Sequence, residues 1–289
     1  MKQLFTVFFL LFFIPMLKAQ NVVLDKEKLL DLYQTQRYAE AASYLQSIYP
    51  SDTQDVKALS QIAYCYMMSG KLPDAEKKYL KINELQPNTL SVLFSLANIN
   101  SRRGNVAAAQ FYLLDIIKID STNFNAYKQL ADYTDSIKLK ISYLEKANKL
   151  NPTEPDVAYD LALQYKYLKH FQPAYNVLNI AIAADTGNFI LQRAQLPIAN
   201  ELKKYDEVVK VGEKLLKNAV DGNVIKDVGK AYFYLKNYSK CVALYKTLED
   251  MAMQNETIYY YMSISYRELK NYELAAEYAK KTIEEGISP

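Results

Sequence analysis

The sequence repeats itself at an interval of about 34 residues, and this feature constrains the fold more than any other. A small or short side chain recurs in the middle of each unit, at intervals of 34, 34, 65, 34, 33 and 34 residues: Ala41, Ala75, Ala109, Ala174, Val208, Cys241 and Ala275. The interval of 65 falls three short of two full periods, so eight units fit and the fourth is compressed. Such a period predicts a stack of identical supersecondary units.

Each unit also has the same internal pattern. The residue three before the marker is apolar or aromatic: Tyr38, Leu72, Val106, Phe171, Tyr205, Tyr238 and Tyr272. The residue twelve before it is usually small: Ala63, Ala97, Ala162, Gly229 and Ser263. Spacings of 3, 4 and 7 place side chains on one helical face, so small residues meet bulky ones between two antiparallel helices. A single helical hairpin cannot bury its apolar face alone, and copies therefore stack.

This pattern resembles the tetratricopeptide repeat family. The second unit matches the family's motif at Ile62, Ala63, Tyr66, Gly70, Leu72, Ala75, Tyr79 and Pro87, and the last unit matches at Tyr266, Tyr272 and Ala275. The Trp that is common in the family's first helix is absent throughout. The resemblance implies an all-α fold, a right-handed α-solenoid of about eight antiparallel helix-turn-helix repeats.

The repeats are expected near 22–55, 56–89, 90–123, 124–154, 155–188, 189–221, 222–255 and 256–289, within an array over 20–289. The fourth unit departs from the pattern, because Lys140 stands at the marker position and the turn between its helices is short. That unit ends in NPTEP, where proline is densest. We expect a change of superhelix pitch, or a weak hinge, near 151–155.

The first 19 residues have the pattern of a secretory signal peptide. An apolar run from Leu4 to Leu17 follows Lys2 and is interrupted only by Thr6. A membrane-spanning helix needs about 20 apolar residues, so the pattern favours a cleaved signal, with cleavage near Ala19. The mature chain is expected to be exported, periplasmic or secreted, with no transmembrane segment. The KAQ exit and the abundance of Lys, Tyr and Asn are similar to those of Bacteroidetes-type bacterial proteins.

Charge and reactive residues argue against two classes of function. Without residues 1–19 the chain has 33 Lys and Arg against 32 Asp and Glu, which provides no electrostatic footprint for nucleic acid. His170 is the only histidine, and it has no neighbours with metal-ligand spacing. Cys65 and Cys241 are five repeats apart, too far for a disulfide in a solenoid. We therefore expect no enzyme activity, no metal and no cofactor.

A partner is expected on the concave face, which first helices line in the resembling family. Exposed aromatic side chains interleaved with Arg and Lys are typical of binding surfaces. The candidate partner-binding residues are Tyr64, Met67, Phe94, Asn98, Arg102, Tyr159, Lys166, Arg193, Lys226, Lys230, Phe233, Tyr260, Tyr261 and Arg267.

The function predicted from these features is a non-enzymatic scaffold of the cell envelope that binds another protein or an extended peptide. It would serve as a subunit of an envelope assembly or secretion complex. A glycan-binding helical-repeat protein with tyrosine platforms is the alternative, against which the absence of Trp argues. A structural homo-oligomer formed by end-to-end stacking of terminal repeats is a third hypothesis.

Overall fold

The structure is a computed structural model that describes residues 23–287, and all regular secondary structure in this range is helical. The predicted signal peptide, 1–19, lies outside the described residues. The chain is organised as two compact units that meet in the sequence at Tyr112 and Leu113, inside one helix. Because the described residues form a succession of helices, the all-α solenoid of helical hairpins predicted from the repeats is confirmed. The predicted pitch change near 151–155 falls inside the second unit and stays a prediction.

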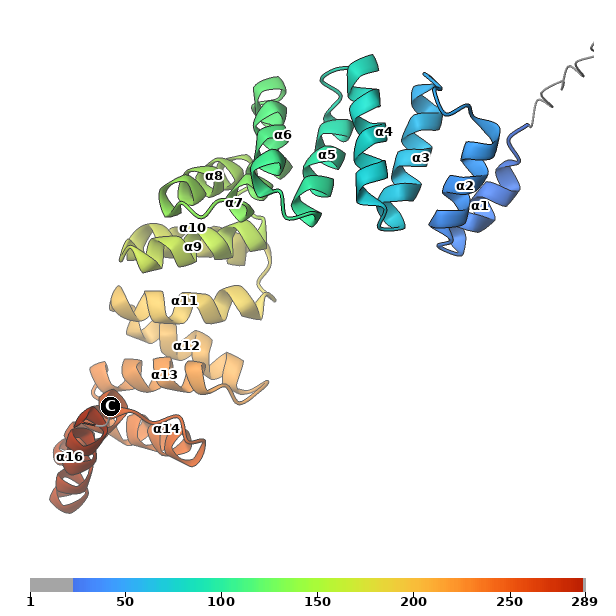
Figure 1. The fold of residues 1–289 in the computed structure, drawn as a ribbon. Coiled ribbons are helices and arrows are strands. Elements are labelled where there is room, and N and C mark those ends of the chain that lie inside the picture. The colour runs from blue at the N-terminus through green and yellow to red at the C-terminus, as the bar shows by residue number, and fades with distance from the viewer. Residues whose placement is uncertain (1–22, 288–289) are drawn as a thin grey trace, which may run out of the picture. The chain divides into compact units, whose positions relative to one another are not determined.

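The first unit consists of successive antiparallel hairpins (Figure 1). Its helices are α1 (Lys26–Gln34), α2 (Tyr38–Ile48), α3 (Val56–Met68), α4 (Leu72–Leu85), α5 (Leu90–Arg102) and the first half of α6 (Val106–Ile119). Each helix packs on the next along the chain from α1 to α5. The core between these helices contains the buried side chains of Leu45, Leu59 and Ile62.

The second unit continues the same alternation after the end of α6. Its helices are α7 (Phe124–Asp132), α8 (Ile137–Leu150), α9 (Pro155–Tyr167), α10 (Phe171–Ala184), α11 (Phe189–Glu201), α12 (Tyr205–Leu216), α13 (Gly222–Tyr234), α14 (Tyr238–Asp250), α15 (Glu256–Glu268) and α16 (Tyr272–Ile287). The odd-numbered helices are the first helices of their hairpins. Successive first helices also touch one another, α9 with α11, α11 with α13, and α13 with α15.

The turn inside each hairpin has a residue with left-handed backbone conformation, except in the fourth. These residues have φ between +57° and +79°: Gln36, Gly70, Gly104, Lys169, Lys203, Lys236 and Lys270. The residue that follows donates its N–H to a carbonyl five positions back, as Lys204 does to Ala199 at 2.9 Å. This bond satisfies a carbonyl that the end of a helix leaves free. The connection 133–136 between α7 and α8 has no such residue.

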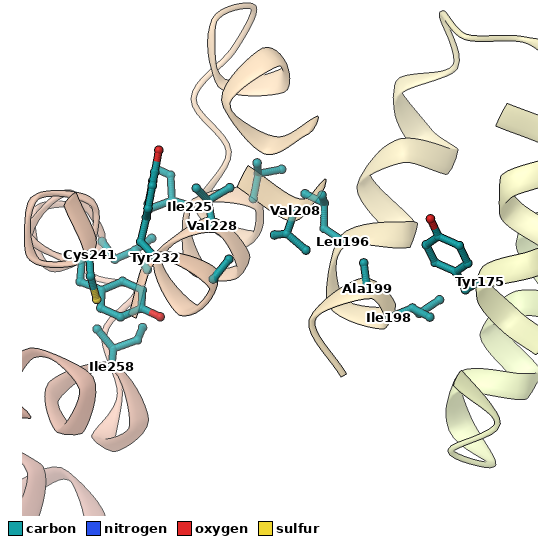
Figure 2. Packing of buried hydrophobic residues seen from close by; sticks show 14 of the residues in the cluster. Tyr175, Leu196, Ile198, Ala199, Val208, Ile225, Val228, Tyr232, Cys241 and Ile258 are labelled. Carbon is teal, nitrogen blue, oxygen red and sulfur yellow. The ribbon is translucent and has the colours of Figure 1, made fainter. Parts of the chain in front are cut away.

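Close approach of the paired helices depends on the small residue predicted in most of the first helices. Ala63, Ala97 and Ala162 are buried, and Gly229 takes the corresponding place on α13. A Cβ atom on Gly229 would lie 2.3 Å from the ring of Tyr245, which is the largest fully buried side chain. The glycine is therefore required by the tyrosine opposite. The core of which this pair is part continues from α9 to α16, and Figure 2 shows residues of it between Tyr175 and Ile258.

Candidate functional site

Three neighbouring hollows lie mainly along the first helices of the second unit, and all three are lined by Ile190. We call them together the Ile190 groove. The cationic hollow, of about 320 Å³, is lined by Tyr159, Leu163, Lys166, Ile190, Arg193, Ala194, Pro197, Asn223, Lys226 and Asp227. The acidic hollow, also of about 320 Å³, is lined by Lys128, Asp132, Pro155, Asp156, Tyr159, Asp160, Asn188, Ile190 and Leu191. The apolar hollow, of about 170 Å³, is lined by Phe189, Ile190, Arg193, Leu215, Asn218, Ala219, Asp221 and Val224.

Ile190 occupies the second position of α11, at the point where the three hollows join. Its side chain is 66% exposed, and that of the adjacent Phe189 is 50% exposed. The preceding Asn188 caps α11 by accepting the N–H of Leu191 at 3.1 Å, which fixes where the helix begins. The first turn of α11 thus presents two adjacent large apolar side chains to solvent.

The cationic hollow contains two ammonium groups without an ion pair. Arg193 is engaged, because its Nη1 lies 2.6 Å from Oδ2 of Asp221 at the start of α13. Lys166 on α9 and Lys226 on α13 form no ion pair among residues 23–287. The hollow therefore presents positive charge that no ion pair with Lys166 or Lys226 neutralises.

Asp227 is the acidic residue that lines the cationic hollow. Asn200 Nδ2 on α11 donates to its carbonyl oxygen at 3.0 Å and to its Oδ1 at 3.3 Å. Burial raises the pKa of this carboxyl from 3.8 to about 6, and the Asn200 hydrogen bond and the charges of Lys166, Lys226 and Lys230 oppose that rise. Part of the Asp227 population is consequently protonated near neutral pH.

The acidic hollow is partly compensated by Lys128 on α7. Its Nζ lies 2.9 Å from Oδ2 of Asp156 and 3.3 Å from Oε1 of Glu154. Burial raises the pKa of Asp132, and also that of Asp160, so both carboxyls hold their protons more tightly than free side chains do. The groove thus runs from an acidic to a cationic region, with Tyr159 lining both.

Pro197 lies inside α11 and lines the cationic hollow. Because proline has no N–H, the carbonyl of Arg193 lacks the intrahelical donor that residue 197 would supply. Arg193 lines the same hollow. Pro197 thus removes one backbone hydrogen bond from α11 beside the cationic hollow.

A second group of candidate residues forms an aromatic cluster, which we define as Tyr205, Phe233, Tyr234, Tyr238, Tyr245, Tyr260 and Tyr261. The rings of Tyr205 and Tyr234 stack with centroids 4.9 Å apart and an interplanar angle of 8°. The ring of Tyr261 lies 4.6 Å from that of Phe233, and its hydroxyl lies 3.5 Å from the hydroxyl of Tyr234. Most of these rings thus contact one another, although Tyr260 remains 50% exposed.

The structure separates the predicted site residues into groups. It brings Tyr159, Lys166, Arg193 and Lys226 together in the cationic hollow, while Phe233, Tyr260 and Tyr261 belong to the aromatic cluster. Lys230 and Arg267 are held by Glu201 and Glu268, at 2.8 and 3.1 Å.

The remaining five predicted residues lie in the first unit. Tyr64 meets Tyr33 and Tyr38 edge-on, and Arg102 donates to the carbonyl of Met67 at 3.2 Å. Phe94 is partly buried and Asn98 is exposed. These residues belong to a separate set from the Ile190 groove.

Sequence reasoning missed Ile190, Phe189 and Asp227. It searched first helices for aromatic and cationic residues, whereas Ile190 is aliphatic and Asp227 is acidic. The available signal was the pair of adjacent large apolar residues, Phe189 and Ile190, directly after the cap Asn188. Asp227 offered no signal, since the groups that act on its carboxyl include Asn200 and Lys166 from other helices.

Three further findings concern metal binding, membrane crossing and disulfide bonds among the described residues. Between residues 23 and 287, no group of three or more His, Cys, Asp and Glu side chains is arranged to hold a metal ion. Within the same range, every helix is too short or too polar to cross a bilayer. Cys65 and Cys241 are both buried, and neither forms a disulfide.

Solved structures with a similar fold identify the architecture. A tetratricopeptide repeat protein from Parabacteroides merdae superposes with a TM-score of 0.50, at 15% sequence identity, over 83% of this chain and 96% of that one. PilF of Pseudomonas aeruginosa superposes with a TM-score of 0.51, at 16% identity, over 66% of this chain and 88% of that one. No family model matches the sequence, and no curated protein does so either. At these identities the likeness concerns the fold.

Proposed function

Since the chain has the fold of tetratricopeptide repeat proteins, we propose that it is an interaction scaffold that binds an extended segment of another protein in the Ile190 groove. The observation that carries this proposal is the meeting of three hollows of different chemistry at one exposed aliphatic side chain. An extended peptide presents side chains of different chemistry at short intervals, and a groove with distinct compartments suits such a ligand.

The side chains of the groove support the same ligand class. Apolar contact at Ile190 would supply binding energy, and the polar groups around it would fix the register of the segment.

The cellular setting that we propose is the bacterial envelope, with the chain as a subunit of an assembly or secretion complex. The support is the signal-peptide pattern of residues 1–19, which precedes the repeat array. The scaffold is proposed to be non-enzymatic, because the residues that line the three hollows include no Ser, Thr, Cys or His, the side chains that most often serve as nucleophile or general base.

A photo-crosslinking experiment tests this proposal. A benzoylphenylalanine is placed at residue 190 in the full chain, and a second variant has it at residue 210, an exposed position on α12 outside the three hollows. We expect one protein to crosslink in cells from residue 190 and not from residue 210. The captured protein is then purified, and its dissociation constant is measured with the unmodified chain.

The neutral substitution Ile190→Gln supplies the second arm of the test. We expect it to weaken binding of the purified partner at least about tenfold, because a central apolar anchor is lost while an exposed residue costs little stability. Equal crosslinking from residues 190 and 210, or unchanged affinity of the Ile190→Gln variant, would overturn the proposed groove.

Glycan binding is a second candidate, and the observation in its favour is the exposure of Tyr234 and Tyr260 at 45% and 50%. Flat exposed rings are platforms on which sugar rings stack. Binding to a glycan array that is lost in the Tyr260→Ala variant and retained in Ile190→Gln would support this function in place of peptide binding.

A further inference from the structure

The cationic hollow has an incompletely compensated charge. Lys166 approaches it from α9 and Lys226 from α13, and neither forms an ion pair among residues 23–287. Arg193 from α11 lines the same hollow while it contacts Asp221 at 2.6 Å. Asp227 is the one carboxylate among the lining residues that faces these three cations.

We propose that the cationic hollow binds an Asp or Glu side chain of the partner segment, while a neighbouring apolar side chain enters the apolar hollow, and that Asp227 makes this binding depend on pH. The two hollows adjoin because both are lined by Ile190 and Arg193. Charge complementarity selects the ligand: Lys166 and Lys226 attract a carboxylate and repel a basic side chain. This inference rests on the proposed function, because it names the kind of segment that the groove accepts.

The pH dependence follows from the charged and titratable groups around Asp227. Lys166 faces it from α9, Arg193 and Asn200 from α11, Lys226 and Lys230 from its own helix, and Tyr245 interacts with it from α14. Ionised Asp227 offsets part of the positive charge that the ligand requires, whereas protonated Asp227 does not.

The direction of the pH effect can be stated. Burial raises the pKa of Asp227 to about 6, whereas an exposed Asp or Glu side chain of the ligand has a pKa of about 4. Between pH 7.5 and pH 5.5 the ligand therefore stays ionised while Asp227 becomes largely protonated. Affinity is expected to rise as pH falls through this window.

A peptide selection followed by affinity measurement tests the inference. Random 12-residue peptides are displayed through their C-termini, so that side chains supply all carboxylates, and are selected on the folded full chain at pH 5.5. We expect the enriched sequences to place Asp or Glu beside a large apolar residue. The best peptide is then synthesised with an amidated C-terminus, and its dissociation constant is measured at pH 5.5 and 7.5.

Three variants separate the contributions. The double variant Lys166→Glu/Lys226→Glu is expected to weaken binding at least about tenfold, as the loss of close charge complementarity predicts. Its matched control, Lys210→Glu/Lys214→Glu, changes charge equally on exposed sites of α12 and should bind like the parent. For the parent we expect binding about threefold to fivefold tighter at pH 5.5 than at pH 7.5. Asp227→Asn should bind equally well at both.

The outcomes distinguish the two proposals. Enriched peptides that lose binding in Ile190→Gln but lack acidic residues, or bind equally to the Lys166→Glu/Lys226→Glu variant, would overturn the carboxylate assignment and leave the groove in place. Peptides that show the charge effect but no change with pH would overturn the role of Asp227. A selection without enrichment, or peptides indifferent to Ile190→Gln, would overturn both the inference and the proposed groove.

Discussion

Two neighbouring regions of the second unit use their side chains in different ways. Around Ile190, on α9, α11 and α13, Lys166 and Lys226 have no ion-pair partner among the described residues and the apolar side chain is 66% exposed. In the aromatic cluster, on α12 to α15, rings stack on rings and hydroxyls approach hydroxyls. The sequence predicted members of both regions as binding residues, Lys166 and Lys226 in the first and Phe233, Tyr260 and Tyr261 in the second. The comparison teaches that composition identifies a surface, while contacts decide which part of it is free to bind.

The largest expected effect concerns Tyr245, the innermost ring of the aromatic cluster. Its ring packs against Gly229 and is 1% exposed, so Tyr245→Ala should lower the free energy of unfolding by about 3–5 kcal/mol. Urea denaturation followed by circular dichroism measures the loss. Tyr245→Phe is the control, and it should cost about 1 kcal/mol, since only the hydroxyl that donates to the Lys226 carbonyl at 3.3 Å is removed. A loss below about 1 kcal/mol for the alanine variant would show that this cluster does not hold the hairpins together.

The contrast itself can be measured with one substitution in each region. Tyr261→Ala removes contacts with Phe233, Tyr234 and Tyr245 and should destabilise the fold by about 2 kcal/mol. Ile190→Ala removes an exposed side chain and should change stability by less than about 0.5 kcal/mol. Thermal unfolding of the two variants and the parent in the same buffer measures the two changes in stability. Equal destabilisation by both would erase the distinction between the two regions.

Asp227 provides a smaller effect with a defined sign. Its pKa is raised from 3.8 in the free side chain to about 6, so between pH 4 and pH 6 the folded state binds more protons than the unfolded state. The contribution of Asp227 to stability therefore declines as pH rises through this window and levels off above it. Asp227→Asn should accordingly stabilise the protein by about 1–2 kcal/mol at pH 7.5 and by almost nothing at pH 4.

Denaturant unfolding at both pH values, on the parent and on Asp227→Asn, measures this difference. The substitution Ile190→Gln changes no titratable group and should therefore alter stability equally at both pH values, which makes it a suitable control. A stabilisation that is the same at pH 4 and pH 7.5 would contradict the origin assigned to it.

The smallest expected effect concerns the turn between α13 and α14. Both regions include residues of α13. Lys236 has a φ of +60°, a conformation that glycine adopts without strain. Relief of this strain should therefore stabilise the Lys236→Gly variant by up to about 1 kcal/mol. The greater conformational entropy of glycine in the unfolded chain should reduce that gain. It should leave peptide affinity unchanged. Calorimetric melting temperatures of the parent and variant provide the measurement, and a clear loss of stability would show that the lysine side chain has a contact role there.

The sequence by itself determined the repeating architecture, because periodicity is a local property. The spacing of the markers from Ala41 to Ala275 and the small residues at Ala63, Ala97, Ala162 and Gly229 depend on helical geometry within single hairpins. The position of the left-handed turns before second helices was likewise predictable, from the glycine or lysine at residues such as Gly70 and Lys203.

Only the tertiary structure decided which residues form the candidate site. The compartments around Ile190 come from α7, α9, α11, α12 and α13, and their chemistry depends on which charges find partners. Arg193 pairs with Asp221 and Lys230 with Glu201, whereas Lys166 and Lys226 stay unpaired among the described residues. These pairings join residues about 28 positions apart, and the burial that raises the pKa of Asp227 is produced by several helices at once. Such properties arise from the packing of repeats on one another, which no pattern within a single repeat contains.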